Sequence, residues 1–209
     1  MTLTHDFCPL CGSPCEERVP EGDHVARAVC TNPECGAIHY VNPKVVVGCI
    51  VEAEGGLLLA RRDIEPARGR WTFPAGYLEV GESMFEGAAR ETVEETEAEV
   101  EELGLHALLD IPHIGQAYTV FRTRMIGARF GPTPESSEVR IVPVAEIPWD
   151  EISFPSVQTA LRLYVDDLER GEHAVHTGVV EWSGEGSRFD LAMYRLRDHR
   201  RVPRTAPDQ

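Results

Sequence analysis

The sequence predicts an α/β protein that carries a small metal-binding segment at its N-terminus. Three observations lead to this prediction: β-branched runs typical of buried strands, stretches with helical apolar spacing, and five cysteines within the first 35 residues. Composition divides the chain into three regions. We expect a cysteine-bearing domain at 1–40, an α/β domain at 41–170 and a polar C-terminal extension at 171–209.

The charge balance argues against several classes of partner. The formal net charge is -15 and the isoelectric point about 4.9, so nonspecific attraction to phosphate backbones or anionic membranes is unfavourable. Residues 1–10 lack a basic start followed by an apolar stretch, and no apolar run is long enough to span a bilayer. We therefore expect a cytoplasmic protein with no nucleic-acid or membrane partner, and a homodimer is compatible with the sequence.

The N-terminal cysteines form two closely spaced pairs, with two and four intervening residues, separated by eighteen residues. This spacing fits four thiolates around one tetrahedral, structural Zn²⁺. The expected ligands are Cys8, Cys11, Cys30 and Cys35. Cys15 could compete with Cys8 as a ligand, and free or oxidised thiols are the alternative to zinc. Cys49 lies inside a β-branched run and is expected to be a small buried hydrophobe.

The α/β region begins with strands. A β-branched run at 44–51 predicts a buried strand, and 57–61 predicts its hairpin partner across the turn at Gly55-Gly56. Alternating residues at 116–126 predict a further long strand, and 138–144 predicts a shorter one.

Two helices follow from apolar spacing and capping residues. Apolar residues at helical spacing predict an amphipathic helix over 155–170, with Gly171 as its stop. In the other helix, Ser83 followed three residues later by Glu86 is a capping-box signature that predicts a start near Met84.

The helix that starts near Met84 concentrates acidic residues. Glu91, Glu94 and Glu95 stand at i, i+3 and i+4, so their carboxylates share one face. Close like charges repel, and a hard divalent cation such as Mg²⁺ would offset that repulsion because it prefers carboxylate oxygens and phosphates. The alternative is an ordinary solvated acidic face.

The residues around these glutamates resemble the signature box of the Nudix hydrolases. The matching positions are Gly76, Glu82, Arg90, Glu91, Glu94 and Glu95. The resemblance implies an α/β/α sandwich with a mixed sheet behind a zinc ribbon, and Mg²⁺- or Mn²⁺-dependent hydrolysis of a nucleoside diphosphate linked to another moiety. Two positions depart from the pattern: Thr92 stands where an aliphatic residue is common, and Glu97 replaces the usual glycine. If position 97 has positive φ, the side chain costs about 1 kcal/mol.

One subgroup of the family pairs a cysteine-rich head with this body. The chain resembles the plant-type FAD and ADP-ribose pyrophosphatases at 76–83, 110–118 and 134–154, and more loosely at 176–199. The nearest rivals are zinc-ribbon NADH pyrophosphatases, whose Ser-Gln-Pro-Trp-Pro-Phe-Pro-type array is replaced here by Asp-Ile-Pro-His-Ile-Gly-Gln at 110–116. The resemblance thus favours FAD, cleaved to FMN and AMP, and ADP-ribose over NADH.

The resemblance also implies roles for individual residues. The expected metal ligands are the Gly76 carbonyl, Glu91, Glu94 and Glu95. Arg90 is expected to orient Glu91 or to pair with Glu82. The general base varies in this family, so it is either Glu91 or a glutamate on a later loop. For that loop glutamate, Glu138 is the first candidate and Glu135 the second, with an ordinary surface charge as the alternative for Glu138.

Cationic and aromatic residues near the box are candidates for substrate contact. Guanidinium groups suit diphosphates, and four arginines precede the box: Arg61, Arg62, Arg68 and Arg70. Tyr118 and Phe73 could stack on a ring, although core packing is the more frequent fate of aromatics in strands. From these we select Arg62, Arg70 and Tyr118 as substrate-binding candidates.

A regulatory protein is the alternative of another class. In it, the Nudix-like body senses a ligand and the cysteine segment contacts a protein or nucleic acid. A sensor would not need all three helix carboxylates and Arg90, and the cysteine segment has only Arg18 and Arg27 as cations. The sequence therefore favours an enzyme.

Overall fold

The computed structural model describes residues 5–187 and 190–204. The chain divides into two compact units, Met1–Pro43 and Lys44–Gln209. The outer ends of the domains expected at 1–40 and 171–209 lie outside the described residues, as do 188–189.

The N-terminal unit contains a small antiparallel sheet in the order β1-β2-β3. Its strands are β1 (Cys15–Arg18), β2 (Arg27–Cys30) and β3 (Ile38–His39). Strand β2 is central and contributes Val29, which is buried. So small a sheet buries little apolar area, and a unit of this size usually needs a metal or disulfides to stay folded.

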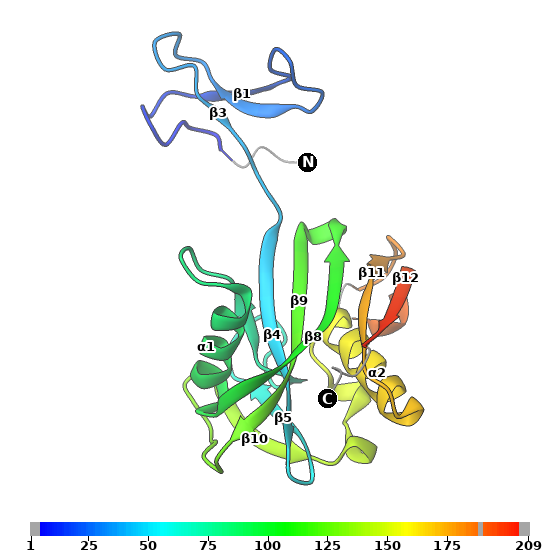
Figure 1. Ribbon diagram of the computed structural model, residues 1–209. Helices are drawn as coiled ribbons and strands as arrows, with labels where there is room; N and C mark the ends of the chain where they lie inside the picture. The colour runs from blue at the N-terminus through cyan, green and yellow to red at the C-terminus, as the bar shows by residue number, and fades with distance from the viewer. Residues whose placement is uncertain (1–4, 188–189, 205–209) are drawn as a thin grey trace. The chain divides into compact units, whose positions relative to one another are not determined.

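The second unit is built on one mixed sheet, nine-stranded within the described residues (Figure 1). The strands follow the order β10-β5-β4-β9-β8-β11-β12, with β6 paired to β5 and β7 paired to β4. The pairs β4–β9 and β8–β11 are parallel, and the others are antiparallel. The strands are β4 (Lys44–Ala53), β5 (Gly56–Arg62), β6 (Trp71–Thr72), β7 (Ala75–Tyr77), β8 (Glu99–Ile111), β9 (Gln116–Ile126), β10 (Ser136–Val142), β11 (Ala174–Trp182) and β12 (Tyr194–Pro203).

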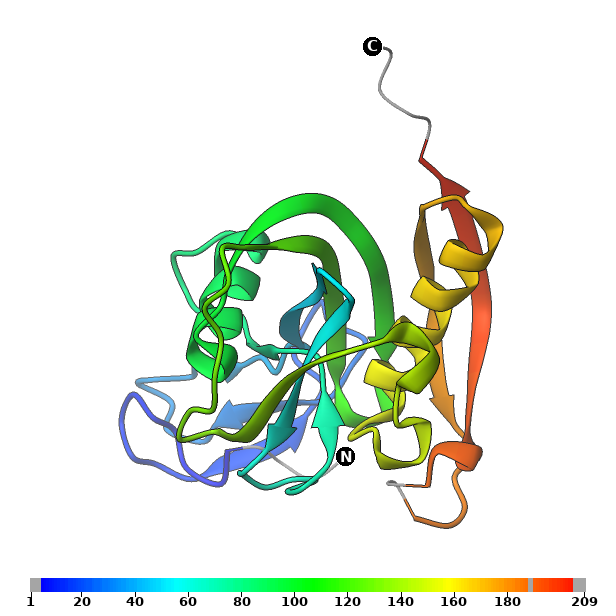
Figure 2. The same cartoon turned by 90° about the horizontal axis from the view of Figure 1, so that it is seen from below.

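Helices α1 (Met84–Thr96) and α2 (Pro155–Arg170) lie on opposite sides of this sheet (Figures 1 and 2). Alternation along β4 explains the two layers, because Val47 and Cys49 pack in the cluster that holds α1 residues, whereas Ile50 packs with α2. The α/β/α sandwich with a mixed sheet is therefore confirmed. Single 3-10 turns complete the unit at Pro112–Ile114, Val144–Glu146, Trp149–Glu151 and Leu191–Met193.

Several expected elements occur with the expected bounds. Strand β9 spans 116–126, and α2 spans 155–170 and ends at Gly171, whose φ is 66°. The capping box is formed: the Glu86 amide donates to Ser83 Oγ over 3.3 Å, and the Ser83 amide donates to the Glu86 carboxylate over 2.7 Å. These local signals work because each depends on neighbouring residues only.

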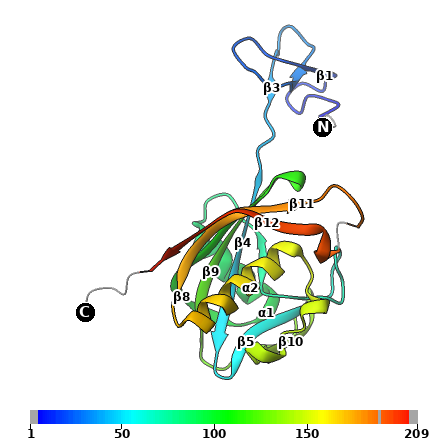
Figure 3. The same cartoon turned by 90° about the vertical axis from the view of Figure 1, so that its right-hand side faces the viewer.

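Among the longer strands, three were not expected from the sequence: β8, β11 and β12. In β8, irregularities between residues 102 and 104 and between 105 and 107 interrupt the alternation that would reveal a strand. Strand β12 is an exposed, arginine-rich edge strand, so its composition resembles that of a polar C-terminal extension. Strands β11 and β12 are consequently neighbours in the sheet, and β11 packs against α2 (Figure 3).

A buried polar cluster ties β11 and β12 to the body. Asp167 of α2 accepts a hydrogen bond from Arg201 Nε over 3.0 Å and lies 3.1 Å from Nε2 of His176. His106 of β8 packs edge-on against His176, with its Nε2 3.0 Å from the Ala160 carbonyl. Arg201 offsets the charge of Asp167 and also pairs with Glu172 over 3.0 Å. The cluster therefore serves as an anchor that joins four elements.

This cluster predicts acid sensitivity. Burial lowers the pKa of His106 from 6.5 to about 4, and a protonated His176 nearby lowers it further. The unfolded chain therefore binds more protons than the folded chain, so stability is lost as pH falls from about 6.5 towards 4, by up to about 3 kcal/mol. We expect urea unfolding of His106→Gln to depend less on pH in this window. His24→Gln, an exposed control, should keep the wild-type dependence; equal slopes in all three proteins would contradict the prediction.

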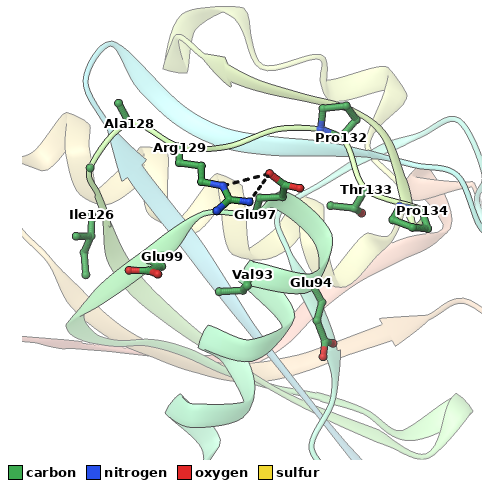
Figure 4. A pocket seen from close by; sticks show the side chains of 11 residues that line it. Val93, Glu94, Glu97, Glu99, Ile126, Ala128, Arg129, Pro132, Thr133 and Pro134 are labelled. Carbon is green, nitrogen blue, oxygen red and sulfur yellow. Dashed lines mark hydrogen bonds and ion pairs between the residues drawn. The ribbon is translucent and has the colours of Figure 1, made fainter.

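The two residues that depart from the box pattern, Thr92 and Glu97, have different structural consequences. Thr92 is fully buried and donates its hydroxyl to the Ala88 carbonyl over 2.8 Å, so its polar group is satisfied. Glu97 caps α1 with a φ of 58°, the conformation that favours glycine. Its carboxylate pairs with Arg129 over 3.2 Å (Figure 4).

We expect Glu97→Gly to stabilise the protein by about 0.5–1 kcal/mol, because it removes the strain of a side chain at positive φ. The lost pair with Arg129 offsets little of this gain, since both side chains are exposed. Chemical denaturation of Glu97→Gly and of Arg129→Ala separates the two effects. A destabilised Glu97→Gly protein would show that the ion pair outweighs the backbone strain.

Candidate active site

The N-terminal unit gathers four thiols. Cys8 and Cys35 sulphurs lie 3.9 Å apart, Cys11 and Cys30 sulphurs 3.4 Å apart, and all four lie within 4.8 Å of one another. Tetrahedral thiolates at a Zn–S distance of about 2.3 Å would be roughly 3.8 Å apart, so the cluster fits zinc. Cys15 lies outside this set. Cys49 is fully buried in the other unit, where burial raises the pKa of its thiol to about 11, as expected of an apolar position.

Arg90 of α1 forms hydrogen bonds with three glutamates of the box. Its Nε and Nη2 donate to the Glu82 carboxylate over 3.0 and 2.8 Å, and its Nη1 donates to Glu91 over 2.8 Å and to Glu94 over 2.9 Å. The arginine holds the pKa of Glu82 at about 2. Arg90 thus contacts Glu82 and Glu91 at the same time.

Glu95 is the most buried carboxylate of the box. Its side chain is 5 % exposed, it accepts a hydrogen bond from the Ala75 amide over 3.0 Å, and it lies 3.9 Å from Arg62. Burial raises its pKa to about 7 in spite of these partners, and the charge of Glu91 adds to the increase. Burial also raises the pKa of Glu91. Carboxylates this crowded and desolvated form an oxygen-only donor set of the kind a hard divalent cation prefers.

Gly76 lies against this carboxylate cluster. A Cβ at this position would come within 2.2 Å of the Glu91 carboxyl carbon, so no larger residue fits without displacing Glu91. The glycine is placed there by β7, which pairs with β4 so that Gly76 is opposite Val47. A requirement for glycine thus follows from packing against the acidic face.

A cavity of about 660 Å³ opens beside the box. Its charged part is lined by box residues together with Arg62, Glu79 and Glu135. Its apolar part is lined by residues of β8, β9, β11 and β12 and by Phe154. Arg62 lies over the Phe154 ring at 5.2 Å and therefore joins the two parts.

The structure brings some of the expected substrate contacts to this cavity and not others. Arg62 and Tyr118 line it. Arg70 does not: its guanidinium donates to the carbonyls of Asp150 and Ile152, over 3.3 and 3.4 Å, so it braces a loop instead. Phe73 is buried in the core, which is the alternative the sequence left open for it.

Glu138, the first loop candidate for the general base, also lies elsewhere. It stands on β10 and pairs with Arg61 over 3.8 Å and with Arg140, and it is not among the described residues that line the cavity. The reason is geometric, because Glu138 is opposite Arg61 and therefore shares the face of Arg61, whereas the neighbouring Arg62 faces the cavity. Glu135, on the loop before β10, does line the cavity and adds to the charge that raises the pKa of Glu91.

Several lining residues were not anticipated. They come from the chain after the box: Ile111, His113, Ile114, Gln116, Phe154, Val180 and Tyr194. Those on β11 and β12 could not be found without recognising that these strands join the sheet. The Asp-Ile-Pro-His-Ile-Gly-Gln segment was singled out by resemblance alone, without a role for His113.

A second cavity, of about 560 Å³, lies at the C-terminal end of α1 (Figure 4). It is lined by Val93, Glu94, Glu97 and Glu99 and by the 126–134 loop. Glu94 borders both cavities, whereas Glu91 and Glu95 line only the first. Of the three box glutamates on α1, the second cavity therefore has only Glu94 among its described lining residues.

The fold and the site define a class: an α/β/α sandwich whose first helix presents an arginine-braced acidic cluster to a cavity, joined to a four-cysteine unit. The sequence comparisons give the family. Residues 42–160 match the NUDIX domain family and residues 6–41 match the Nudix N-terminal family, a zinc ribbon. The chain belongs to the Nudix family.

A crystal structure of a Nudix hydrolase from Nitrosomonas europaea is similar over most of the chain. It shares 45% identity and a TM-score of 0.80, covering 84% of this chain and 98% of the other. A NAD-capped RNA hydrolase NudC of Stutzerimonas stutzeri is 32% identical over 136 residues, which is 64% of this chain and 46% of that protein. The phosphatase NudJ of Escherichia coli K12 is 46% identical over 54 residues, 26% of this chain and 35% of that protein. The chain thus spans less than half of these curated relatives.

No helix within the described part of the chain is both long enough and apolar enough to cross a membrane.

Proposed function

We propose that the protein is a metal-dependent pyrophosphohydrolase that cleaves the diphosphate of a nucleoside diphosphate linked to a second moiety. The observation that supports this most is that Glu91, Glu94, Glu95 and Arg62 all line one cavity, whose volume of about 660 Å³ suits a dinucleotide. A ligand sensor, the alternative class, would not need two largely buried carboxylates, Glu91 and Glu95, beside a third on the same helix.

The proposed metal ligands are Glu91, Glu94, Glu95 and the Gly76 carbonyl. Bound Mg²⁺ or Mn²⁺ would neutralise phosphate charge and lower the pKa of an attacking water. The protein's own contribution is positional: Arg90 fixes Glu91 and Glu94 through charge-assisted hydrogen bonds, and the Ala75 amide fixes Glu95. Arg62, 11 % exposed, is the cation placed to contact the diphosphate.

For the general base, two glutamates at the cavity compete. Glu91 is held by Arg90, and burial raises its pKa towards the range in which a carboxylate accepts a proton more readily. Glu135 is on a loop at the edge of the same cavity, where it is free of the Arg90 network. We assign the role to Glu91 or Glu135 in preference to Glu138. If the Glu135→Gln variant retains the wild-type kcat, Glu91 is the remaining candidate for the general base.

FAD and ADP-ribose are the proposed substrates, because the segments at 110–118 and 134–154 resemble plant-type FAD and ADP-ribose pyrophosphatases. The residues of the box cannot make this choice, since they contact groups that all these substrates share. NADH is the second candidate, and the relative named NAD-capped RNA hydrolase NudC favours it. The same relative brings RNA into consideration, so the expected absence of a nucleic-acid partner stays a prediction.

One panel of substrates tests the proposal. Purified protein with Mg²⁺ or Mn²⁺ is incubated with FAD, ADP-ribose, NADH and NAD-capped RNA, and products are separated by chromatography. We expect FAD to give FMN and AMP, with ADP-ribose as a competing substrate. A kcat/KM for NADH or capped RNA well above both would overturn the substrate choice, and no cleavage of any compound would overturn the enzyme assignment.

A further inference from the structure

The apolar part of the cavity extends across the sheet towards its edge strand β12. Its walls include Val46 of β4, Tyr118 of β9, Ile111 of β8, Val180 of β11 and Tyr194 of β12. These five strands are consecutive neighbours in the sheet. At about 4.8 Å between neighbouring strands, the four steps from β4 to β12 span roughly 19 Å. The cavity is therefore elongated and ends at the β11–β12 hairpin.

The two ends of this cavity differ in chemistry. All six acidic lining residues, among the described ones, come from the segments 65–95 and 135. The described lining residues of 111–118 and 180–194 include no Asp, Glu, Lys or Arg. One end thus suits a diphosphate with its cations, whereas the other suits an apolar, ring-shaped group.

An aromatic pair stands at the apolar end. The Tyr194 hydroxyl lies 3.3 Å from Nε2 of His113, and the two rings are 5.5 Å apart. Trp182 is opposite Tyr194 across the β11–β12 hairpin. The centroid of its ring lies 5.9 Å from that of His113, so His113 contacts both aromatic rings. The rings are therefore held in place before any ligand arrives, which lowers the entropy lost on binding.

The hairpin that carries Tyr194 is itself anchored. The cluster of Asp167, His176 and Arg201 fixes β11 and β12 to α2, as described above. The anchor keeps the aromatic pair at a constant distance from the box.

We propose that Tyr194 and His113 form a stacking site for an aromatic ring of the substrate, and that this site selects dinucleotide-type substrates over those without a ring at that end. The inference rests on the proposed function, in which the diphosphate binds at the other, charged end of the cavity. It assigns to the C-terminal hairpin a specificity-determining role.

Binding of the product halves tests this site without requiring turnover. AMP, FMN and ribose 5-phosphate are titrated by calorimetry into wild type and Tyr194→Ala. We expect the variant to bind at least one of the two ring-bearing phosphates roughly tenfold more weakly, because stacking on the aromatic ring is lost. Ribose 5-phosphate, which has no aromatic ring, should change less than twofold. The ring-bearing compound that weakens identifies which half of the substrate lies at the hairpin.

Two further variants make the test specific. Tyr194→Phe keeps the ring and removes the hydroxyl, so it should bind within about threefold of wild type. Arg195→Ala, on the next and exposed position of β12, should bind as wild type does and controls for the fold of the hairpin. Unchanged binding of both AMP and FMN by Tyr194→Ala, or an equal loss for ribose 5-phosphate, would overturn the proposal. Because no hydrolysis is measured, these outcomes are separate from failure of the substrate panel.

Discussion

Glu95→Gln is expected to lose more than about a hundredfold in kcat/KM, since replacement of groups that only support metal ligands already costs about 10–100-fold. The substitution removes the charge of the most buried carboxylate of the box. It keeps an oxygen that can accept the Ala75 amide hydrogen bond. Because burial raises the pKa of Glu95 to about 7, a neutral side chain should be tolerated, and the melting temperature should stay equal or rise.

Glu99→Gln is the matched control for this loss. Glu99 is exposed and borders the second cavity, outside the box, so its variant should retain wild-type kcat/KM. Initial rates at saturating Mg²⁺, with thermal melts of the same samples, separate loss of chemistry from loss of fold. Undiminished turnover by Glu95→Gln would remove Glu95 from the set of metal ligands.

Sequence reasoning succeeded where the signals are local. The helix of the box could be predicted because its capping residues and its acidic face are encoded within a few positions, as Ser83 and Glu86 show. The same holds for α2, whose stop is a glycine at positive φ. Here the physical cause and its sequence signature lie within one turn of helix, so neighbouring residues suffice.

The prediction failed where position depends on pairing between distant segments. Arg70 and Glu138 have the right chemistry for the site, but Arg70 donates to the carbonyls of Asp150 and Ile152, and the register of β10 against β5 sets Glu138 opposite Arg61. Tyr194 lines the cavity because β12 pairs with β11 and β11 runs parallel to β8. Such long-range pairing leaves only a weak pattern in a bulged strand such as β8 and in an arginine-rich edge strand such as β12.

The N-terminal unit is expected to contain about one zinc per chain and to lose its fold with the metal. Its three strands are two to four residues long and bury little apolar surface, so the packing alone is too weak to hold the thiols within 4.8 Å of one another. Structural zinc supplies roughly 10–16 kcal/mol in comparable peptides, which is enough to fold such a segment. Four thiolates also bind far more tightly than the carboxylates of the box, so mild EDTA should leave this zinc in place.

Cys11→Ser and Cys15→Ser form a matched pair for this prediction. Cys11 belongs to the four-thiol cluster, whereas Cys15 does not, although both lie in the same short segment. Elemental analysis of freshly purified, reduced protein should show about one zinc in wild type and Cys15→Ser and clearly less in Cys11→Ser. The thermal transition of the Lys44–Gln209 unit should persist in all three proteins, because that unit has its own core. Wild-type protein without zinc, or zinc lost from Cys15→Ser instead of Cys11→Ser, would contradict the assignment of the ligands.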